Sequence, residues 1–431
     1  MRFSIRSLAV SACALTAALA ATSASALVIQ PVFDQSITSD PNAATIENGI
    51  YSVIAFYQSL FTDNVTVKIY FQEGGGLGGS LRGYYYNSAG LAINALTADA
   101  STADDAVAVS HLNTNVFGSV AYSTANGRAL GLNTPGLISV NGVNDYDGII
   151  TLNTSVCFYN HYSPEGGKFD FFSVCSHELD EILGTWSGAS DWLAYTADLF
   201  RYDGSGNRSF SGDANAHAYF SIDGMNDIVE YNQYGHTQGD WGDWVSHIPS
   251  QTQDWLIYSG QSITPGEPEL RLLDVVGYDR VTRADSYSIY RGAYQSGSTY
   301  SLMAVDANPL VVRAGVTPIA SDYPVQVIVV GTSPTHNPSS LQLRLSSKVQ
   351  LSHIGQTVEF YDFSAGAYVP VDFRIGTQGY ASIEVTTTSP ARFVDPATGH
   401  VQARIKFKGT QALPILGWNV WLDQVAWNIK P

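Results

Sequence analysis

The chain has 431 residues, of which 45% are hydrophobic, 12% aromatic and 14% charged. This combination excludes an intrinsically disordered polymer, which would carry more charge and fewer apolar residues. The formal net charge of −17 argues against nucleic acids and anionic membranes as partners.

The first 26 residues have the pattern of a secretory signal peptide. Arg2 and Arg6 precede a short apolar stretch at residues 8–20, and Ala24-Ser25-Ala26 is a small-residue cleavage site. Beyond this segment no apolar run reaches the roughly 18 residues that a membrane-spanning helix needs. We therefore expect a secreted, extracellular protein of bacterial type without a membrane span.

The next part of the chain alternates helical and strand patterns. Apolar spacing predicts a helix that begins near Asp40-Pro41 and runs to residue 61, and two further helices at residues 89–98 and 103–112. Residues 65–71 and 149–156 have the composition of strands. Gly74 to Gly79 is not followed by Lys-Ser/Thr, which argues against a phosphate-binding loop.

The segment His177-Glu178-Leu179-Asp180-Glu181 is the most informative in the chain. An apolar face at residues 171–183 predicts a helix, and Gly184 stands where a helix commonly ends. Residues four apart share one helix face, so His177 and Glu181 are expected to point the same way. An imidazole and a carboxylate in this arrangement can both bind Zn²⁺. Glu178 is then placed to act as a general base on a water activated by the metal.

This helix resembles that of the H-E-x-x-H zinc metallopeptidases. More narrowly, the chain is similar to a family of secreted bacterial metalloproteases, distantly metzincin-like, through residues 197–202, 239–244 and 270–278 as well. The resemblance covers roughly residues 27–279. It implies a zincin-like domain with an active-site helix below the substrate cleft, and a zinc-dependent endopeptidase that acts on a protein or peptide.

The sequence departs from that family at two ligand positions. Glu181 replaces the second His, and Ser187 stands where a metzincin would have its third His. We expect Asp198 to complete the metal site, with Asp191 as the second choice. Three downstream histidines also remain candidates for the third ligand: His217, His236 and His247.

Two cysteines, Cys157 and Cys175, remain after the signal peptide is removed. In an exported protein such a pair is a disulfide candidate, and two buried thiols are the alternative.

Composition changes near residue 280. From there short alternating strands separated by turn residues predict an all-β sandwich, which resembles a C-terminal module of secreted bacterial proteins with no assigned activity. The expected organisation is a signal peptide (1–26), a zincin-like catalytic domain of α+β class (27–280) and a β-sandwich accessory domain (284–431).

Two functions from different classes follow from the sequence. The first is the secreted zinc endopeptidase, with His177, Glu181 and Asp198 as ligands and Glu178 as the catalytic base. The alternative is a non-catalytic binding or adhesion protein, built on a degenerate zincin domain, whose C-terminal domain contacts a surface or polymer. A carbohydrate-active enzyme that uses two carboxylates is a third possibility.

Overall fold

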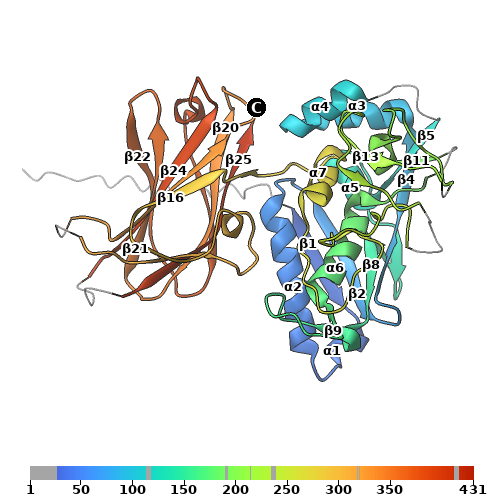
Figure 1. The fold of residues 1–431 in the computed structure, drawn as a ribbon, viewed down its shortest axis with the longest axis horizontal. Helices are drawn as coiled ribbons and strands as arrows, with labels where there is room; N and C mark the ends of the chain where they lie inside the picture. The colour runs from blue at the N-terminus through green and yellow to red at the C-terminus, as the bar shows by residue number, and fades with distance from the viewer. Residues whose placement is uncertain are drawn as a thin grey trace, which may run out of the picture.

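A computed structural model describes residues 27–112, 118–189, 193–213, 215–233, 239–317, 319, 321–411 and 417–431. The expected signal peptide and the candidate ligands Asp191 and His236 lie outside these residues. Figure 1 shows a part rich in helices beside a part built of strands. Within the described ranges, no helix combines the length and the apolar character that crossing a membrane requires.

A four-stranded sheet forms the centre of the N-terminal part, with strand order β1-β2-β8-β3. The first three strands are parallel and β3 runs antiparallel at the edge next to β8. Their bounds are β1 Val28–Phe33, β2 Thr66–Glu73, β3 Gly78–Arg82 and β8 Gly148–Leu152. Val67, Ile69 and Phe71 alternate along β2 and are fully buried, so the sheet anchors the core of this part.

Most helices expected from the apolar spacing are present, with shifted ends. Helix α2 (Ala43–Leu60) buries Ile46, Ile50, Val53 and Tyr57 along one face, as a period of 3.6 residues requires. It packs against α6 (Phe171–Asp180), the helix of the His-Glu segment. The remaining helices are α1 Gln35–Thr38, α3 Ala89–Asp99, α4 Ala103–His111, α5 Thr124–Ala129 and α7 Glu267–Val275.

The fold class expected from the sequence, a zincin-like α+β domain followed by a sandwich, is wrong. Strands make up 36% of the chain and helices 22%, so the molecule is mainly β. The expected class was wrong partly because segments with no clear strand pattern in the sequence pair as short strands through tertiary contacts. These are β4 Tyr84–Ser88, β5 Ser119–Ser123, β6 Ile138–Val140, β7 Val143–Tyr146, β9 Cys157–Phe158, β10 Phe169–Asp170, β11 Ala194–Tyr195, β12 Arg201–Tyr202, β13 Tyr219–Phe220 and β14 Val229–Glu230.

The C-terminal part contains two antiparallel sheets around a second hydrophobic core (Figure 1). One sheet has the order β17-β18-β25-β20-β23, with β15 also paired to β25, and the other has the order β16-β19-β24-β21-β22. Alternating residues such as Val325, Val327 and Val329 face the core. The strands are β15 Thr282–Arg283, β16 Ser286–Arg291, β17 Ala293–Ser296, β18 Leu310–Arg313, β19 Val325–Thr332, β20 Ser340–Val349, β21 Ile354–Asp362, β22 Ala367–Ile375, β23 Ala381–Thr386, β24 His400–Gly409 and β25 Asn419–Lys430.

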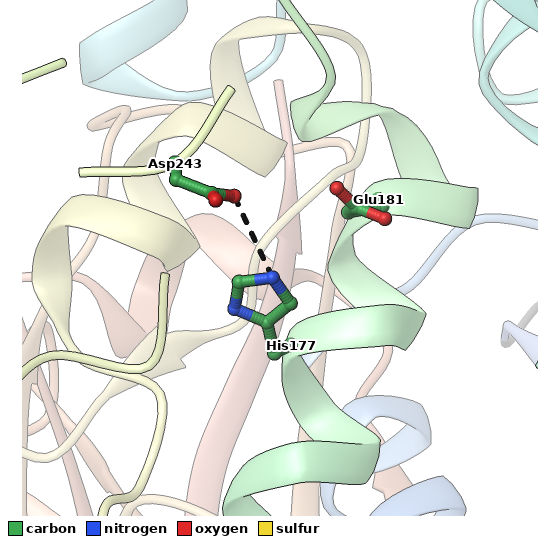
Figure 2. Close-up of side chains that lie close together, drawn as sticks. All are labelled: His177, Glu181 and Asp243. Carbon is green, nitrogen blue, oxygen red and sulfur yellow. Dashed lines mark ion pairs between the residues drawn. The ribbon is translucent and has the colours of Figure 1, made fainter. Parts of the chain in front are cut away.

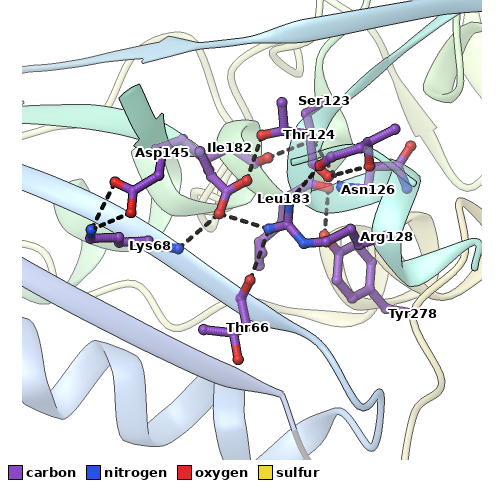
Figure 3. A network of polar contacts seen from close by, with 12 residues as sticks. Thr66, Lys68, Ser123, Thr124, Asn126, Arg128, Asp145, Ile182, Leu183 and Tyr278 are labelled. Atoms are coloured by element: carbon purple, nitrogen blue, oxygen red, sulfur yellow. Dashed lines mark hydrogen bonds and ion pairs between the residues drawn. The ribbon is translucent and has the colours of Figure 1, made fainter. Parts of the chain in front are cut away.

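Helix α6 ends in a π-helical turn, Glu181–Thr185, that widens the backbone at the functional segment. Such a turn frees carbonyl groups, and two side chains satisfy them. Ser123 Oγ donates to the Ile182 carbonyl at 2.7 Å, and Tyr278 Oη donates to the Leu183 carbonyl at 2.9 Å (Figure 3). The end of the helix is therefore fixed from the last residue of β5 and from the segment after α7.

The two cysteines are both buried and are not bonded to each other. Cys157 Sγ donates to the Asn153 carbonyl at 3.3 Å. Burial raises the pKa of Cys157 to about 12, which keeps the thiol protonated and unreactive at neutral pH. The structure thus has the two buried thiols that were the alternative to a disulfide.

Polar contacts join the two parts of the chain. Arg344 on β20 is buried, and its guanidinium donates to the Phe61 carbonyl at 3.0 Å and pairs with Glu384 at 3.1 Å. Gln424 on β25 donates to the Ser59 carbonyl at 2.8 Å. These bonds satisfy the carbonyl groups at the end of α2, which would otherwise be buried without partners.

We expect Arg344→Leu to destabilise the protein by about 1–3 kcal/mol, because it leaves buried carbonyl oxygens without donors. The measurement is the midpoint of urea unfolding followed by fluorescence. Arg374→Leu is the matched control, since Arg374 pairs with Asp372 at a partly exposed site and should change stability by less than about 0.5 kcal/mol. Equal midpoints for the two variants would contradict the structural role given to Arg344.

Candidate metal centre

Helix α6 places the His-Glu segment at the floor of a cleft. Asp170 caps the start of the helix, and its carboxylate accepts a hydrogen bond from the Ser173 backbone N–H at 3.2 Å. Phe171, Val174 and Leu179 on the helix are buried in the core. This orientation turns His177, Glu178 and Glu181 towards a cavity of about 560 Å³ that all three line.

Asp243 enters the cleft from a loop far along the chain. In the Gly239–Asp243 segment, Gly242 packs against the backbone of Thr185 and Ser187, so closely that a Cβ atom would lie 3.0 Å from the Ser187 nitrogen. One oxygen of Asp243, Oδ2, accepts from the Asp240 backbone N–H at 2.7 Å. The other oxygen is thereby turned towards α6.

His177, Glu181 and Asp243 form a group that fits a metal ion, with potential ligand atoms all within 4.8 Å of one another. Figure 2 shows the imidazole and the Glu181 carboxylate projecting from one helix, with Asp243 facing them. His177 Nε2 lies 3.5 Å from Asp243 Oδ1. Zinc binds such ligands at about 2.0–2.2 Å, so one ion can reach both atoms.

The other ring nitrogen of His177 fixes the tautomer of the imidazole. His177 Nδ1 lies 2.9 Å from the carbonyl oxygen of Thr252, which can only accept, so Nδ1 carries the proton. The lone pair of a neutral ring is then on Nε2, the atom that faces Asp243. Metal-binding histidines usually have such a carbonyl or carboxylate partner on the opposite nitrogen.

Glu181 is held by a buried arginine. Arg82 on β3 donates to Glu181 Oε2 at 2.7 Å, and both side chains are almost fully buried. The same guanidinium lies 3.8 Å from the centre of the Trp186 ring, and its Nε donates to Tyr84 Oη at 2.5 Å. Arg82 therefore fixes one oxygen of Glu181 and leaves the other facing the cleft.

Two buried carboxylate oxygens that accept no hydrogen bond indicate that these residues suit a metal ion. Glu181 Oε1 and Asp243 Oδ1 are buried and accept no hydrogen bond within the described part of the chain, and the charged neighbour of Asp243 Oδ1 is His177 Nε2 at 3.5 Å. An uncompensated buried carboxylate oxygen is costly, by about 1–3 kcal/mol or more for a charged group. One imidazole nitrogen and two carboxylate oxygens are ligands that zinc accepts. The donor set therefore fits a divalent ion.

Burial and the crowding of negative charge shift the pKa values of Glu178, Asp243 and His177. Burial, with the charge of Glu181 adding to it, raises the pKa of Glu178 to about 8 and that of Asp243 to about 7. Burial lowers the pKa of His177, but the surrounding carboxylates outweigh it and raise the pKa to about 10. The carboxylates thus retain protons, or require a cation, because solvent does not stabilise their charge.

Asp198, the third ligand expected from the sequence, does not lie in this group. It is fully buried, and its Oδ1 accepts from Ser187 Oγ at 2.5 Å. Its Oδ2 accepts from the Tyr195 backbone N–H at 2.8 Å and from that of Gly188 at 3.2 Å. These bonds occupy both oxygens, so Asp198 fixes the loop after α6, and Asp243 takes the place beside His177.

The two described histidine candidates are also paired elsewhere. His217 Nδ1 lies 2.5 Å from a Glu230 oxygen on the surface, and His247 Nδ1 lies 2.6 Å from an Asp254 oxygen. Neither belongs to the group around His177. The sequence did contain a signal for Asp243, since residues 239–244 were among the segments that carried the family resemblance.

Comparisons with known proteins add little to this geometry. No protein-family model and no curated protein matches the chain. Similar solved structures include a mutant of a family 29 carbohydrate-binding module (10% identity, TM-score 0.21, 34% of this chain and 88% of that one). A carbohydrate-binding module of family 4 is another, with 15% identity, a TM-score of 0.24, and coverage of 34% and 96%.

These neighbours are binding modules and not peptidases. Because the TM-scores are 0.24 or lower, we base no functional conclusion on them.

We predict that Asp243→Asn lowers zinc affinity by at least about 10-fold, because a neutral amide replaces a charged ligand. Asp198→Asn should retain zinc binding and lower the melting temperature, since it disturbs only the buried loop. Zinc titration with a competing chelator measures the first effect and thermal unfolding the second. The opposite pattern would make Asp198 the ligand, as first expected from the sequence.

Proposed function

We propose that this protein is a secreted, zinc-dependent endopeptidase. The observation that carries the proposal is the convergence of His177 Nε2 with two unpartnered carboxylate oxygens, from Glu181 and Asp243, in one cleft. These three residues would hold the ion. When bound, zinc supplies a Lewis acid that acidifies water and polarises a carbonyl group.

Glu178 is the residue that moves protons. It follows His177 on α6, lines the same cavity and is buried. Its carboxylate would accept a proton from the attacking water and pass it to the leaving amine, as a general base and then a general acid. A raised pKa suits this double role, because the group must both take up and release a proton near neutral pH.

Strand β3 supports a peptide as the substrate. It forms the edge of the four-stranded sheet, and Leu77 to Ser80 line the cleft. An edge strand offers backbone N–H and C=O groups to an extended chain. The absence of a side chain at Gly78 lets the Glu178 carboxylate lie close to this strand, since a Cβ atom at Gly78 would lie 2.5 Å from Glu178 Oε1. A peptide paired along β3 would therefore pass directly over Glu178.

Arg82 compensates for the replacement of a histidine ligand by Glu181. A carboxylate ligand reduces the positive charge of a metal centre relative to an imidazole, and this weakens its action on water. The Arg82 guanidinium withdraws part of that negative charge through its bond to Glu181 Oε2. The buried pair therefore supports hydrolysis at a site with two acidic ligands.

We expect Glu178→Gln to keep zinc at one ion per chain and to lower kcat for peptide cleavage by about 10²–10⁴-fold, because the base is lost while the ligands remain. The assay is a fluorogenic peptide library with metal analysis of the same preparations. Glu165→Gln is the matched control, since Glu165 lies on the surface in a pair with Lys168 and should leave kcat unchanged.

The non-catalytic binding protein makes a different prediction in this assay. It predicts bound zinc with no cleavage of any peptide by the unmodified chain, and equal behaviour of the two variants. That result would overturn the peptidase and favour binding through the C-terminal part.

A further inference from the structure

A second cavity, of about 300 Å³, lies where the two parts of the chain meet. Helix α2 contributes Ser52, the segment after β9 contributes Tyr159 and Tyr162, and the C-terminal part contributes Asp306 and Asp423. The cavity shares no lining residue with the cleft of the candidate metal centre. It is at the lower end of the size range of small-molecule sites.

One buried carboxylate in this cavity has an oxygen without a partner. Asp423 on β25 is 1% exposed, and its Oδ1 makes no hydrogen bond to any described residue. Its Oδ2 accepts weakly from the Ala307 backbone N–H at 3.3 Å. Asp306 brings a second carboxylate into the same cavity, with one oxygen bonded to the Asn308 backbone N–H at 2.9 Å.

The two carboxylates disfavour each other's charge. Burial, followed by the charge of Asp306, raises the pKa of Asp423 to about 7. Burial also raises the pKa of Asp306. Within the described ranges neither carboxylate forms a salt bridge, and His161 opposes the effect of burial on the pKa of Asp306 only in part.

Aromatic rings form much of the remaining wall. Tyr159, Tyr162, Phe172 and Tyr380 all line the cavity. Aromatic faces attract cations, and Tyr380 already does so, because Lys348 Nζ lies 4.3 Å from the centre of its ring. His161 also lines the cavity, but its ring nitrogens already lie 2.6 Å from an Asp170 oxygen and 2.9 Å from Thr264 Oγ1, so the charged groups left for a ligand are the two acids.

We propose that this cavity binds an organic cation, a primary ammonium or guanidinium group on a short alkyl chain. The positive head would pair with Asp423 Oδ1 and Asp306, and the alkyl chain would lie against the aromatic rings. A neutral ligand would leave the two carboxylates uncompensated. A metal ion would need further ligands, and the only described group of three ligating side chains is the one around His177.

The test uses the full chain and isothermal titration with n-pentylammonium at pH 8. We expect saturable binding, at least 10-fold tighter than that of 1-pentanol, which has the same alkyl chain without the charge. Asp423→Asn should weaken pentylammonium binding at least 10-fold. Asp372→Asn is the matched control, since Asp372 pairs with Arg374 on β22 and should leave binding unchanged.

A second variant tests the site in case Asp423→Asn fails to fold. Ser52→Trp fills the cavity from an exposed position of α2 and keeps both carboxylates, so it too should abolish binding. Asp243→Asn should bind pentylammonium normally, which separates this site from the metal centre. The positive group could belong to a free amine or to the side chain of a peptide. Titration with a lysine-containing tripeptide with blocked ends distinguishes these two sources, and binding of either ligand supports the site.

Three results would overturn the proposal. These are no measurable binding of pentylammonium by the unmodified chain, equal binding of pentylammonium by Asp423→Asn, and binding of calcium that is lost in Asp423→Asn. The last result would make the cavity a site for an inorganic cation.

Discussion

The burial of three carboxylates beside one imidazole governs the structure and the chemistry of the cleft. Glu178 comes from α6, Glu181 from the π-helical turn that follows it, and Asp243 from a loop that packs on this turn. Water cannot stabilise their charge, so protons or a cation must do so. Arg82 supplies one positive charge through its bond to Glu181 Oε2. Glu181 Oε1 and Asp243 Oδ1 have no such partner and face His177 Nε2.

The helix that carries this site could be predicted from sequence because its information is local. An apolar face with a period of 3.6 residues predicted α6, and the spacing of four residues placed His177 and Glu181 on one side. The same argument predicted α2, α3 and α4, and the predicted ends lie within a few residues of the observed ends. Each of these elements depends on contacts between residues close together in the chain.

The third member of the group could not be found in this way, because tertiary packing selects it. Asp198 and Asp243 both follow α6 and both are buried acids. Both carboxylate oxygens of Asp198 accept hydrogen bonds, from Ser187 and from backbone N–H groups. Asp243 instead faces the cleft, because the neighbouring Gly242 packs closely against the backbone after α6. Arg82 was missed for the same reason, since it reaches Glu181 only through the position of β3 beside α6. The fold class failed because short strands such as β12 to β14 form through distant pairing and have little pattern of their own.

The central claim is that His177, Glu181 and Asp243 bind one zinc ion together. Anomalous X-ray diffraction at the zinc edge, from crystals of the zinc-loaded protein, tests it most directly. We expect one strong peak within bonding distance of His177 Nε2, Glu181 Oε1 and Asp243 Oδ1. A fully loaded crystal whose zinc lies at other residues, or one with no peak in this cleft, would contradict it.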